Sequence, residues 1–369
     1  MLRSKLFRRI LHNCSPSLVT IKLPLVLLNS FDLENGPNAV SKMLIALYIA
    51  ILNCTYSDND YRLKVNIVIL IFRIPLSVSI CGFVQQVPLK ILTRLHRVLI
   101  LNMVFKNIVH KHLIRNSGYL NGKFTAGSAR PGSVFDVVNP ANGKTLIQLP
   151  RMGVQDVHDG AKYATDAWHK WKNTTGKERS KVLRDMFNLM NHYKDDLAAI
   201  ITLEAGKPLA EAKGEIGYAS SFYELYAEEA KRINGEVLTT PNNGRRVLAL
   251  KQSVGPAGLI TPWNFPSAMI TRKVAPALAA GCSVLIKPAE QTPLSALALC
   301  AIAEEAGVPP GVINCLTVGR EEVIGVGEAI CHSKLIRKVS FTGSTAVGKW
   351  LMKESSTTVK RVSDYSDTI

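Results

Sequence analysis

Hydrophobic and polar positions between residues 254 and 290 follow two different spacings. Apolar residues fill 258–261, recur at helical spacing over 267–280, and fill 283–286 again. Short apolar runs are typical of buried parallel strands, and the longer periodic segment is typical of an amphipathic helix. We expect Ser267 to be the N-cap of this helix and Gly281 to end it. The pattern predicts a βαβ unit whose loops lie at the sheet edge where α/β proteins bind ligands.

The pattern continues toward the C-terminus as further alternating strands and helices. We expect helices over 294–306, 322–331 and 347–355, and strands over 312–318 and 338–341. Alternating elements of this kind predict an α/β fold with a parallel, Rossmann-like sheet.

Residues 118–252 precede this unit and are mostly helical in pattern. Two strands are expected within 118–138, separated by a turn at 127–132, and a third strand over 145–149. Helices are expected over 156–171, 178–193, 195–204 and 209–234, followed by a strand over 246–252. Thr175 and Glu178 form a capping-box pattern at the start of the second helix. An aromatic stripe on the last helix is expected to be core: Tyr218, Phe222, Tyr223 and Tyr226.

Composition adds a strong positive charge and widely spaced cysteines. The 369 residues carry a net charge of +17 and have a pI near 9.6. No arginine-rich groove or aromatic ladder accompanies this charge, so we expect no nucleic-acid partner. Seven cysteines without a CxxC pair indicate a reducing compartment rather than a disulfide framework.

The first 117 residues differ in character from the rest of the chain. Residues 1–28 are basic and lack acidic side chains, which predicts a mitochondrial presequence, with a plain basic tail as the alternative. Residues 65–84 are apolar but contain Arg73 and Pro75, so we expect no transmembrane helix there. For 33–115 we expect poor order or loosely associated helices. His110 and His112 stand two residues apart, as solvated histidines usually do, and we expect no metal site.

Three motifs resemble the cofactor domain of the aldehyde dehydrogenase superfamily. They are Pro262-Trp263-Asn264-Phe265-Pro266, Lys287-Pro288-Ala289-Glu290 and the segment from Phe341 to Gly348. The segment from Ser267 to Lys273 is similar to the succinate-semialdehyde dehydrogenase group within that family. The resemblance covers about 118–363 and implies two regions, a presequence-like and atypical extension over 1–117 and an NAD-binding domain over 118–369.

The resemblance assigns roles to individual residues. It implies that Asn264 donates a hydrogen bond to a developing oxyanion, and that Arg272 binds both the substrate carboxylate and the cofactor. It implies that Lys287 and Glu290 bind the adenosine ribose. A glutamate here favours NAD, although relatives with it can use NADP. The implied cofactor-binding residues are Thr261, Pro262, Trp263, Arg272, Lys287, Pro288, Ala289, Glu290, Gly343, Ser344, Thr345, Ala346, Val347 and Gly348.

The chain departs from the family pattern after Ser363. Relatives continue with a Glu-Leu-Gly-Gly motif that supplies the general base, whereas Tyr365 stands at the place of that glutamate. We expect the nucleophilic cysteine and the catalytic domain to be missing, and the chain to be truncated. Cysteines 282, 300, 315 and 331 fall in apolar elements and are expected to be inert.

These observations leave several functions open. The leading hypothesis is NAD(P)-dependent oxidation of succinate semialdehyde to succinate by a mitochondrial, homo-oligomeric family, with no turnover by this chain as written. The alternatives are a dehydrogenase for another ω-substituted aldehyde, a non-catalytic nucleotide-binding or subunit-interaction fragment, and a membrane-associated protein through residues 43–84.

Overall fold

The computed structural model describes residues 104–367. The chain divides into two compact units, Met1–Pro88 and Leu89–Ile369, and every described residue belongs to the second. The expectations for the presequence and for the apolar segments at 43–52 and 65–84 therefore lie outside the described residues. Within 104–367, no helix is long and apolar enough to cross a membrane.

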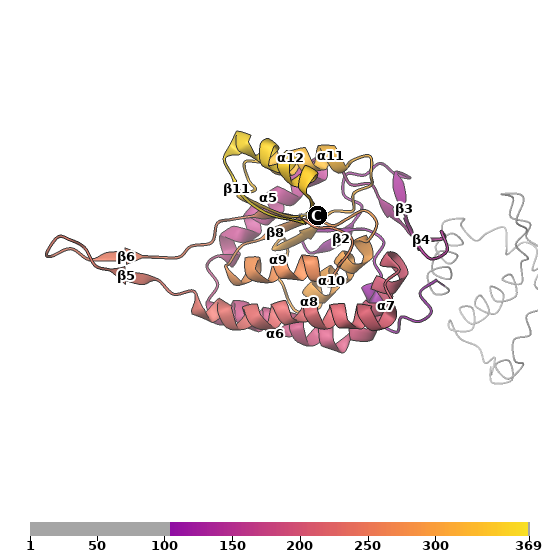
Figure 1. The fold of residues 1–369 in the computed structure, drawn as a ribbon, viewed down its shortest axis with the longest axis horizontal. Coiled ribbons are helices and arrows are strands. Elements are labelled where there is room, and N and C mark those ends of the chain that lie inside the picture. Colours follow the sequence, from indigo (N-terminus) through magenta and orange to yellow (C-terminus); the bar gives the residue numbers. More distant parts are fainter. Residues whose placement is uncertain (1–103, 368–369) are drawn as a thin grey trace, which may run out of the picture. The chain divides into compact units, whose positions relative to one another are not determined.

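A mixed, mainly parallel sheet is the centre of this unit (Figure 1). Its strand order is β11-β10-β7-β8-β9-β1-β2. The first five strands in that order are parallel, and β1 is antiparallel to both β9 and β2. The predicted α/β class with a Rossmann-like parallel sheet is confirmed. The strands are β1 (Gly118–Leu120), β2 (Lys123–Thr125), β7 (Ala257–Ile260), β8 (Val284–Lys287), β9 (Ile313–Cys315), β10 (Lys338–Ser344) and β11 (Arg361–Asp367).

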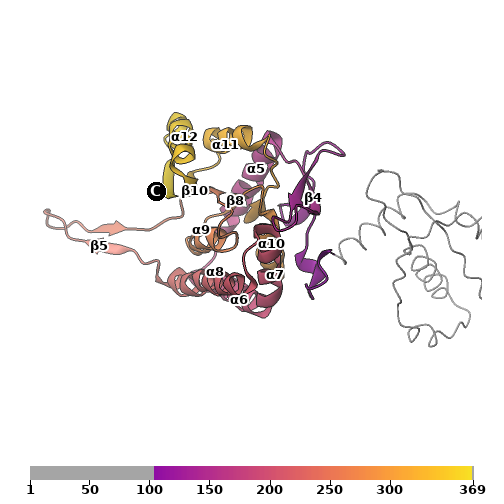
Figure 2. The same ribbon diagram turned by 45° about the vertical axis from the view of Figure 1, so that its right-hand side comes forward.

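Helices cover both faces of the sheet (Figures 1 and 2). Helices α9 (Ala268–Ala279) and α10 (Pro293–Glu305) lie on one face, and α6 (Gly176–His192), α7 (Lys194–Ala205) and α8 (Leu209–Glu229) pack outside them. Helices α5 (Val154–Trp171), α11 (Val323–His332) and α12 (Thr345–Ser355) lie on the other face. Strands with both faces covered bury all their side chains, which explains the unbroken apolar runs of β7 and β8.

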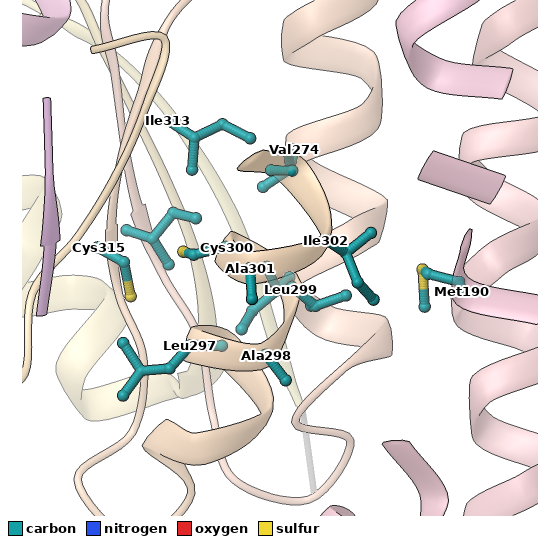
Figure 3. Close-up of a cluster of buried hydrophobic side chains, with 14 of the residues drawn as sticks. Met190, Val274, Leu297, Ala298, Leu299, Cys300, Ala301, Ile302, Ile313 and Cys315 are labelled. Carbon is teal, nitrogen blue, oxygen red and sulfur yellow. The ribbon is translucent and has the colours of Figure 1, made fainter. Parts of the chain in front are cut away.

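Each face has its own hydrophobic cluster. Figure 3 shows part of the larger one, in which Ile302 of α10 lies on the side of Met190 of α6, and Leu297 of α10 lies on the side of Cys315 of β9. The second cluster joins α5, α11 and α12 to the opposite side of the strands. In the aromatic stripe of α8, Tyr223 is fully buried, whereas Tyr218 is half exposed, so the expectation of a core stripe holds for only part of it.

Two smaller sheets lie outside the central one. Strands β3 (Val134–Val138) and β4 (Thr145–Pro150) form an antiparallel pair. Strands β5 (Glu236–Leu238) and β6 (Val247–Ala249) form a hairpin that projects away from the helices (Figure 1). The hairpin exposes large apolar side chains, including Val237 and Leu248.

The predicted strand across Tyr119–Phe124 is wrong, because the chain reverses there. Asn121 and Gly122 both have positive φ angles, 50° and 75°, and connect β1 to β2. Such a pair of residues is typical of a two-residue hairpin turn. The region 118–138 therefore holds three strands rather than two.

The expectation of loose structure up to residue 115 is also wrong for its described part. Phe105, Ile108 and Leu113 are at most 1% exposed and belong to the larger hydrophobic cluster. His110 Nδ1 lies 2.6 Å from Asp196 Oδ2, and His112 Nε2 lies 3.5 Å from a Glu305 carboxylate oxygen. The two histidines are thus paired with carboxylates rather than simply solvated, and they attach this segment to α7 and α10.

Candidate functional site

Three chain segments with predicted site residues leave the same edge of the sheet. Ile260, the last residue of β7, pairs with Lys287 of β8 on one side and with Phe341 of β10 on the other. Strands β7 and β8 thus end at one level, and β10 continues beyond it to Ser344 at the same edge. Their following loops carry the three motifs, as expected for a ligand-binding edge of an α/β sheet.

The segment after β7 contains the predicted oxyanion donor. Thr261 is buried and Pro262 is half-buried, whereas Trp263 is 57% exposed and Asn264 is also exposed. The side-chain amide of Asn264 is therefore accessible four residues beyond the end of β7. An accessible amide at this edge is compatible with hydrogen bonding to a reacting oxygen.

Helix α9 begins differently from the expectation. Ser267 is the N-cap residue, but its side chain makes no capping hydrogen bond, and its hydroxyl has no hydrogen-bond partner within the described residues. Instead, Oε1 of Glu215 accepts hydrogen bonds from the backbone N–H groups of Ser267 (2.9 Å) and Ala268 (3.2 Å). A carboxylate from α8 thus replaces the predicted serine cap and takes up two helix-terminal N–H groups.

The segment after β8 contains a buried lysine beside a glutamate. The side chain of Lys287 is 7% exposed, and its Nζ lies 3.5 Å from Oε2 of Glu290, whose side chain is 23% exposed. Burial lowers the pKa of Lys287, and the Glu290 carboxylate opposes that shift. An ammonium has three donor hydrogens and a carboxylate about four acceptor sites, so both groups retain capacity for further hydrogen bonds. The pair matches the donor and acceptor set of two neighbouring ribose hydroxyls.

Helix α10, which follows this loop, also begins on a buried glutamate. The Glu204 carboxylate accepts hydrogen bonds from the backbone N–H groups of Leu294 (2.7 Å) and Ser295 (2.8 Å), and from the hydroxyl of Ser295 (2.5 Å). Burial raises the pKa of Glu204 to about 8, although these hydrogen bonds lower it. The loop between β8 and α10 is therefore anchored to α7.

The segment after β10 differs from the predicted boundaries. Gly343 and Ser344 are the last residues of β10, and α12 begins at Thr345 rather than at Val347. A Cβ atom on Gly343 would lie 2.5 Å from the Phe341 ring, so glycine is needed there for space. Ser344, Ala346 and Val347 are exposed. An exposed helix start at this edge is compatible with binding a phosphate group.

Arg272 and Lys273 lie next to each other on α9 but in different environments. Arg272 is half-buried, and its Nη1 lies 3.6 Å from the sulfur of Met269. Lys273 is 6% exposed and donates a hydrogen bond of 2.9 Å to the hydroxyl of Ser340 on β10. Lys273 thus links α9 to the strand beneath it, whereas Arg272 is the more accessible cation.

The described cysteines do not resemble a catalytic nucleophile. All four are free and buried: Cys282, Cys300, Cys315 and Cys331. A hydrogen bond with Cys315 and burial raise the pKa of Cys300, and burial raises the pKa of Cys331. A raised pKa disfavours the reactive thiolate, so the expectation of inert thiols agrees with the structure. Residue 365 lies on β11, where its backbone pairs with Thr342.

The structure thus brings all three predicted motifs to one edge and adds residues that the sequence analysis missed. The missed residues are charged side chains behind the loops: Glu204, Lys207, Glu215 and Lys273. Glu204 and Glu215 occupy core-facing positions of α7 and α8, and a carboxylate at such a position is the sequence signal that could have identified them.

Comparison with known proteins agrees with this geometry. The model of the aldehyde dehydrogenase family matches residues 126–364. A succinate-semialdehyde dehydrogenase [NADP(+)] of Saccharomyces cerevisiae is 50% identical over 252 residues, which cover 68% of this chain and 50% of the relative. The mitochondrial succinate-semialdehyde dehydrogenase of Homo sapiens is 49% identical over 251 residues, covering 68% of this chain and 46% of the relative. The chain spans about half the length of the curated relatives it matches.

Solved structures show the same relationship. A succinate-semialdehyde dehydrogenase from Burkholderia pseudomallei is 46% identical, with a TM-score of 0.67 over 69% of this chain and 52% of that one. A betaine aldehyde dehydrogenase from Staphylococcus aureus in complex with NAD+ is 27% identical, with a TM-score of 0.67 over 72% of this chain and 52% of that one. The family match, the sequence identity and the shared sheet all agree, and the chain belongs to the aldehyde dehydrogenase family.

Proposed function

We propose that this chain forms the dinucleotide-binding part of an NAD(P)-dependent dehydrogenase that oxidises succinate semialdehyde to succinate. The observation that carries the proposal is the strand register, because Ile260 pairs with both Lys287 and Phe341 and so aligns the three motif-bearing loops. A single edge then offers a ribose-binding pair, an exposed helix start and an accessible amide.

Each loop has a distinct task in this proposal. Lys287 and Glu290 hold the two ribose hydroxyls, and the start of α12 binds the pyrophosphate. A bound nicotinamide would supply the hydride acceptor, and the hydride would come from the tetrahedral adduct that forms once a nucleophile has added to the aldehyde carbon. Asn264 donates a hydrogen bond to the oxygen of the reacting carbonyl and stabilises the negative charge that develops there.

Arg272 supports succinate semialdehyde as the substrate. A guanidinium binds a carboxylate through two parallel hydrogen bonds, which favours an aldehyde that carries a distal acid group. The relatives from yeast, human and Escherichia coli are all named as succinate-semialdehyde dehydrogenases. We expect an Arg272→Met variant to lose preference for ω-carboxylated aldehydes over neutral ones.

Glu290 supports NAD as the preferred dinucleotide. Its carboxylate would lie close to the 2′-phosphate of NADP and would repel it. The yeast and Escherichia coli relatives carry NADP(+) in their names, whereas the Staphylococcus aureus structure contains NAD+. The preference therefore depends on what surrounds this glutamate, and we propose NAD with some tolerance of NADP.

Calorimetric titration of the full chain with NAD and with NADP tests the proposal. We expect Lys287→Met to weaken NAD binding at least tenfold, since a buried donor to the ribose is lost. Glu290→Gln is expected to reduce the difference in binding affinity between NAD and NADP. Lys213→Met is the matched control, because Lys213 is a solvent-accessible lysine of α8 that pairs with Asp195. Absence of dinucleotide binding by the unmodified chain would overturn the proposal.

A non-catalytic role is the second candidate, and the buried cysteines favour it. None of the four described thiols is accessible to an aldehyde. A chain that binds NAD but turns over no aldehyde would act as a nucleotide-binding or subunit-interaction protein. Assays with several aldehydes, carried out on NAD-binding preparations, separate the two candidates.

Location and assembly follow from other parts of the chain. The basic, acid-free residues 1–28 support import into mitochondria. The location of a fluorescent protein fused to these residues tests this proposal.

The exposed apolar side chains of the β5–β6 hairpin support the homo-oligomeric assembly expected of the family. The molar mass measured by light scattering tests this proposal.

A further inference from the structure

Lys207, in the turn between α7 and α8, contacts the Asn264 segment directly. Its Nζ donates a hydrogen bond of 2.9 Å to the backbone carbonyl of Asn264 and lies 3.8 Å from the centre of the Phe265 ring. The same Nζ forms an ion pair with Oε2 of Glu215. One ammonium group therefore contacts two consecutive residues of this segment and a carboxylate on α8.

Glu215 holds the other end of the same segment. Its second oxygen, Oε1, accepts the backbone N–H groups of Ser267 and Ala268. Between them, Lys207 and Glu215 contact the chain at Asn264, Phe265, Ser267 and Ala268. The segment is thus fixed at the residue that carries the accessible amide and at three of the four residues that follow it.

The pair is largely shielded from solvent. The side chain of Lys207 is 14% exposed and that of Glu215 is 1% exposed. Both residues also line a hollow of about 550 Å³, together with Asn264 and Phe265. Shielding strengthens the electrostatic contacts and makes the loss of one partner costly to the other.

We propose that Lys207 and Glu215 are positioning residues that hold the Asn264 segment in the geometry needed for oxyanion binding. The inference rests on the proposed function, because it assumes Asn264 as the donor. Lys207 acts through the backbone of Asn264, and Glu215 acts through the first turn of α9. A purely structural role, in which each residue only balances the charge of the other, is the competing explanation.

Hydrogen exchange measured by mass spectrometry on the full chain tests the proposal. In Lys207→Met we expect the backbone amides of Trp263, Asn264, Phe265, Ser267 and Ala268 to exchange at least tenfold faster than in the unmodified chain. Peptides covering β8 serve as an internal reference, since global destabilisation would accelerate exchange there as well. Lys213→Met should leave exchange of 262–268 unchanged. Unchanged exchange in Lys207→Met would overturn the proposal.

The double variant Lys207→Met/Glu215→Gln separates positioning from charge balance. Glutamine keeps an oxygen for the N–H groups of Ser267 and Ala268, and no charge remains unpaired. We expect the midpoint of thermal unfolding to be higher in the double variant than in Lys207→Met. The amides near Asn264 should still exchange at least tenfold faster than in the unmodified chain. Recovery of slow exchange in the double variant would show that charge balance alone explains the pair.

The two proposals fail in distinguishable ways. If the unmodified chain binds no dinucleotide, the proposed function is wrong, but the exchange measurements still report whether Lys207 orders the segment. If the chain binds NAD and Lys207→Met leaves exchange near Asn264 unchanged, the positioning role is wrong and the proposed function stands.

Discussion

The three helices that follow the candidate site loops begin in two different ways. Helices α9 and α10 begin on the buried carboxylates of Glu215 and Glu204, which accept backbone N–H groups. The serine and threonine at their N-cap positions make no capping hydrogen bonds through their side chains. Helix α12 begins after the exposed Ser344, which likewise provides no side-chain cap.

The difference indicates which helix start suits an anionic ligand. A carboxyl group at a helix N-terminus takes up the N–H groups that a phosphate would otherwise use. The starts of α9 and α10 therefore serve to hold the loops in place. The start of α12 is exposed, which is compatible with pyrophosphate binding and agrees with the motif that the sequence places there.

The largest expected effect concerns the buried cap of α10. The pKa of Glu204 is raised by burial to about 8, so the folded state binds more protons than the unfolded state between about pH 4.5 and 8. Stability should therefore fall as pH rises through this interval, by on the order of 5 kcal/mol from this group. Glu204→Gln, which cannot ionise, should remove that fall.

Urea unfolding at pH 5, 7 and 9 measures this effect. Glu304→Gln provides a control, because Glu304 is an exposed carboxylate on the same helix and pairs with Arg115, which does not titrate in this range. An identical pH dependence in the Glu204→Gln variant and the unmodified chain would contradict the buried, proton-binding cap.

A second prediction concerns a variant in which α12, like α9 and α10, has a carboxylate at its N-terminus. Ser344→Asp should stabilise the chain by about 0.5 kcal/mol, because aspartate is a good N-cap and a negative charge suits this helix end. The same charge should weaken NAD binding about tenfold by repelling the pyrophosphate. Thermal melting and calorimetric titration together detect this opposite change in stability and affinity. Ser344→Asn caps without adding charge, and it should retain most of the affinity.

The last prediction concerns an exposed cap, whose loss should change stability alone. Thr175 and Glu178 form the predicted capping box of α6, with the Glu178 N–H donating to the threonine hydroxyl at 3.2 Å and the Thr175 N–H donating to Glu178 at 2.7 Å. Thr175→Ala should reduce stability by about 1 kcal/mol without altering dinucleotide affinity. A loss comparable to that at the buried caps would show that burial does not distinguish the two kinds of helix start.

Local signals in the sequence accounted for much of the fold. The apolar runs predicted β7 and β8, and helical spacing predicted α5, α9 and α10 within a few residues. The capping box at Thr175 is confirmed because each of its partners lies within one turn of chain. The strand predicted across Asn121 was wrong, since the turn chemistry of Asn-Gly outweighed the alternating pattern.

Contacts between distant residues could not be predicted in the same way. The Ser267 cap looked complete in the sequence, yet a carboxylate 52 residues earlier in the chain takes its place. Residues 104–113 looked foreign to the domain, but Phe105 and Leu113 fit into the larger hydrophobic cluster. Both outcomes depend on which helices become neighbours, which no local pattern encodes.

The sequence by itself determined the strand and helix periodicity and the identity of the chemically useful residues, because both depend on short stretches of chain. Only the tertiary structure decided that Ile260 aligns the three loops, and that Lys207 and Glu215 support the one that carries Asn264. The physical reason is that strand register and buried ion pairs arise from packing between segments tens of residues apart, whereas periodicity and capping arise within a single turn or strand.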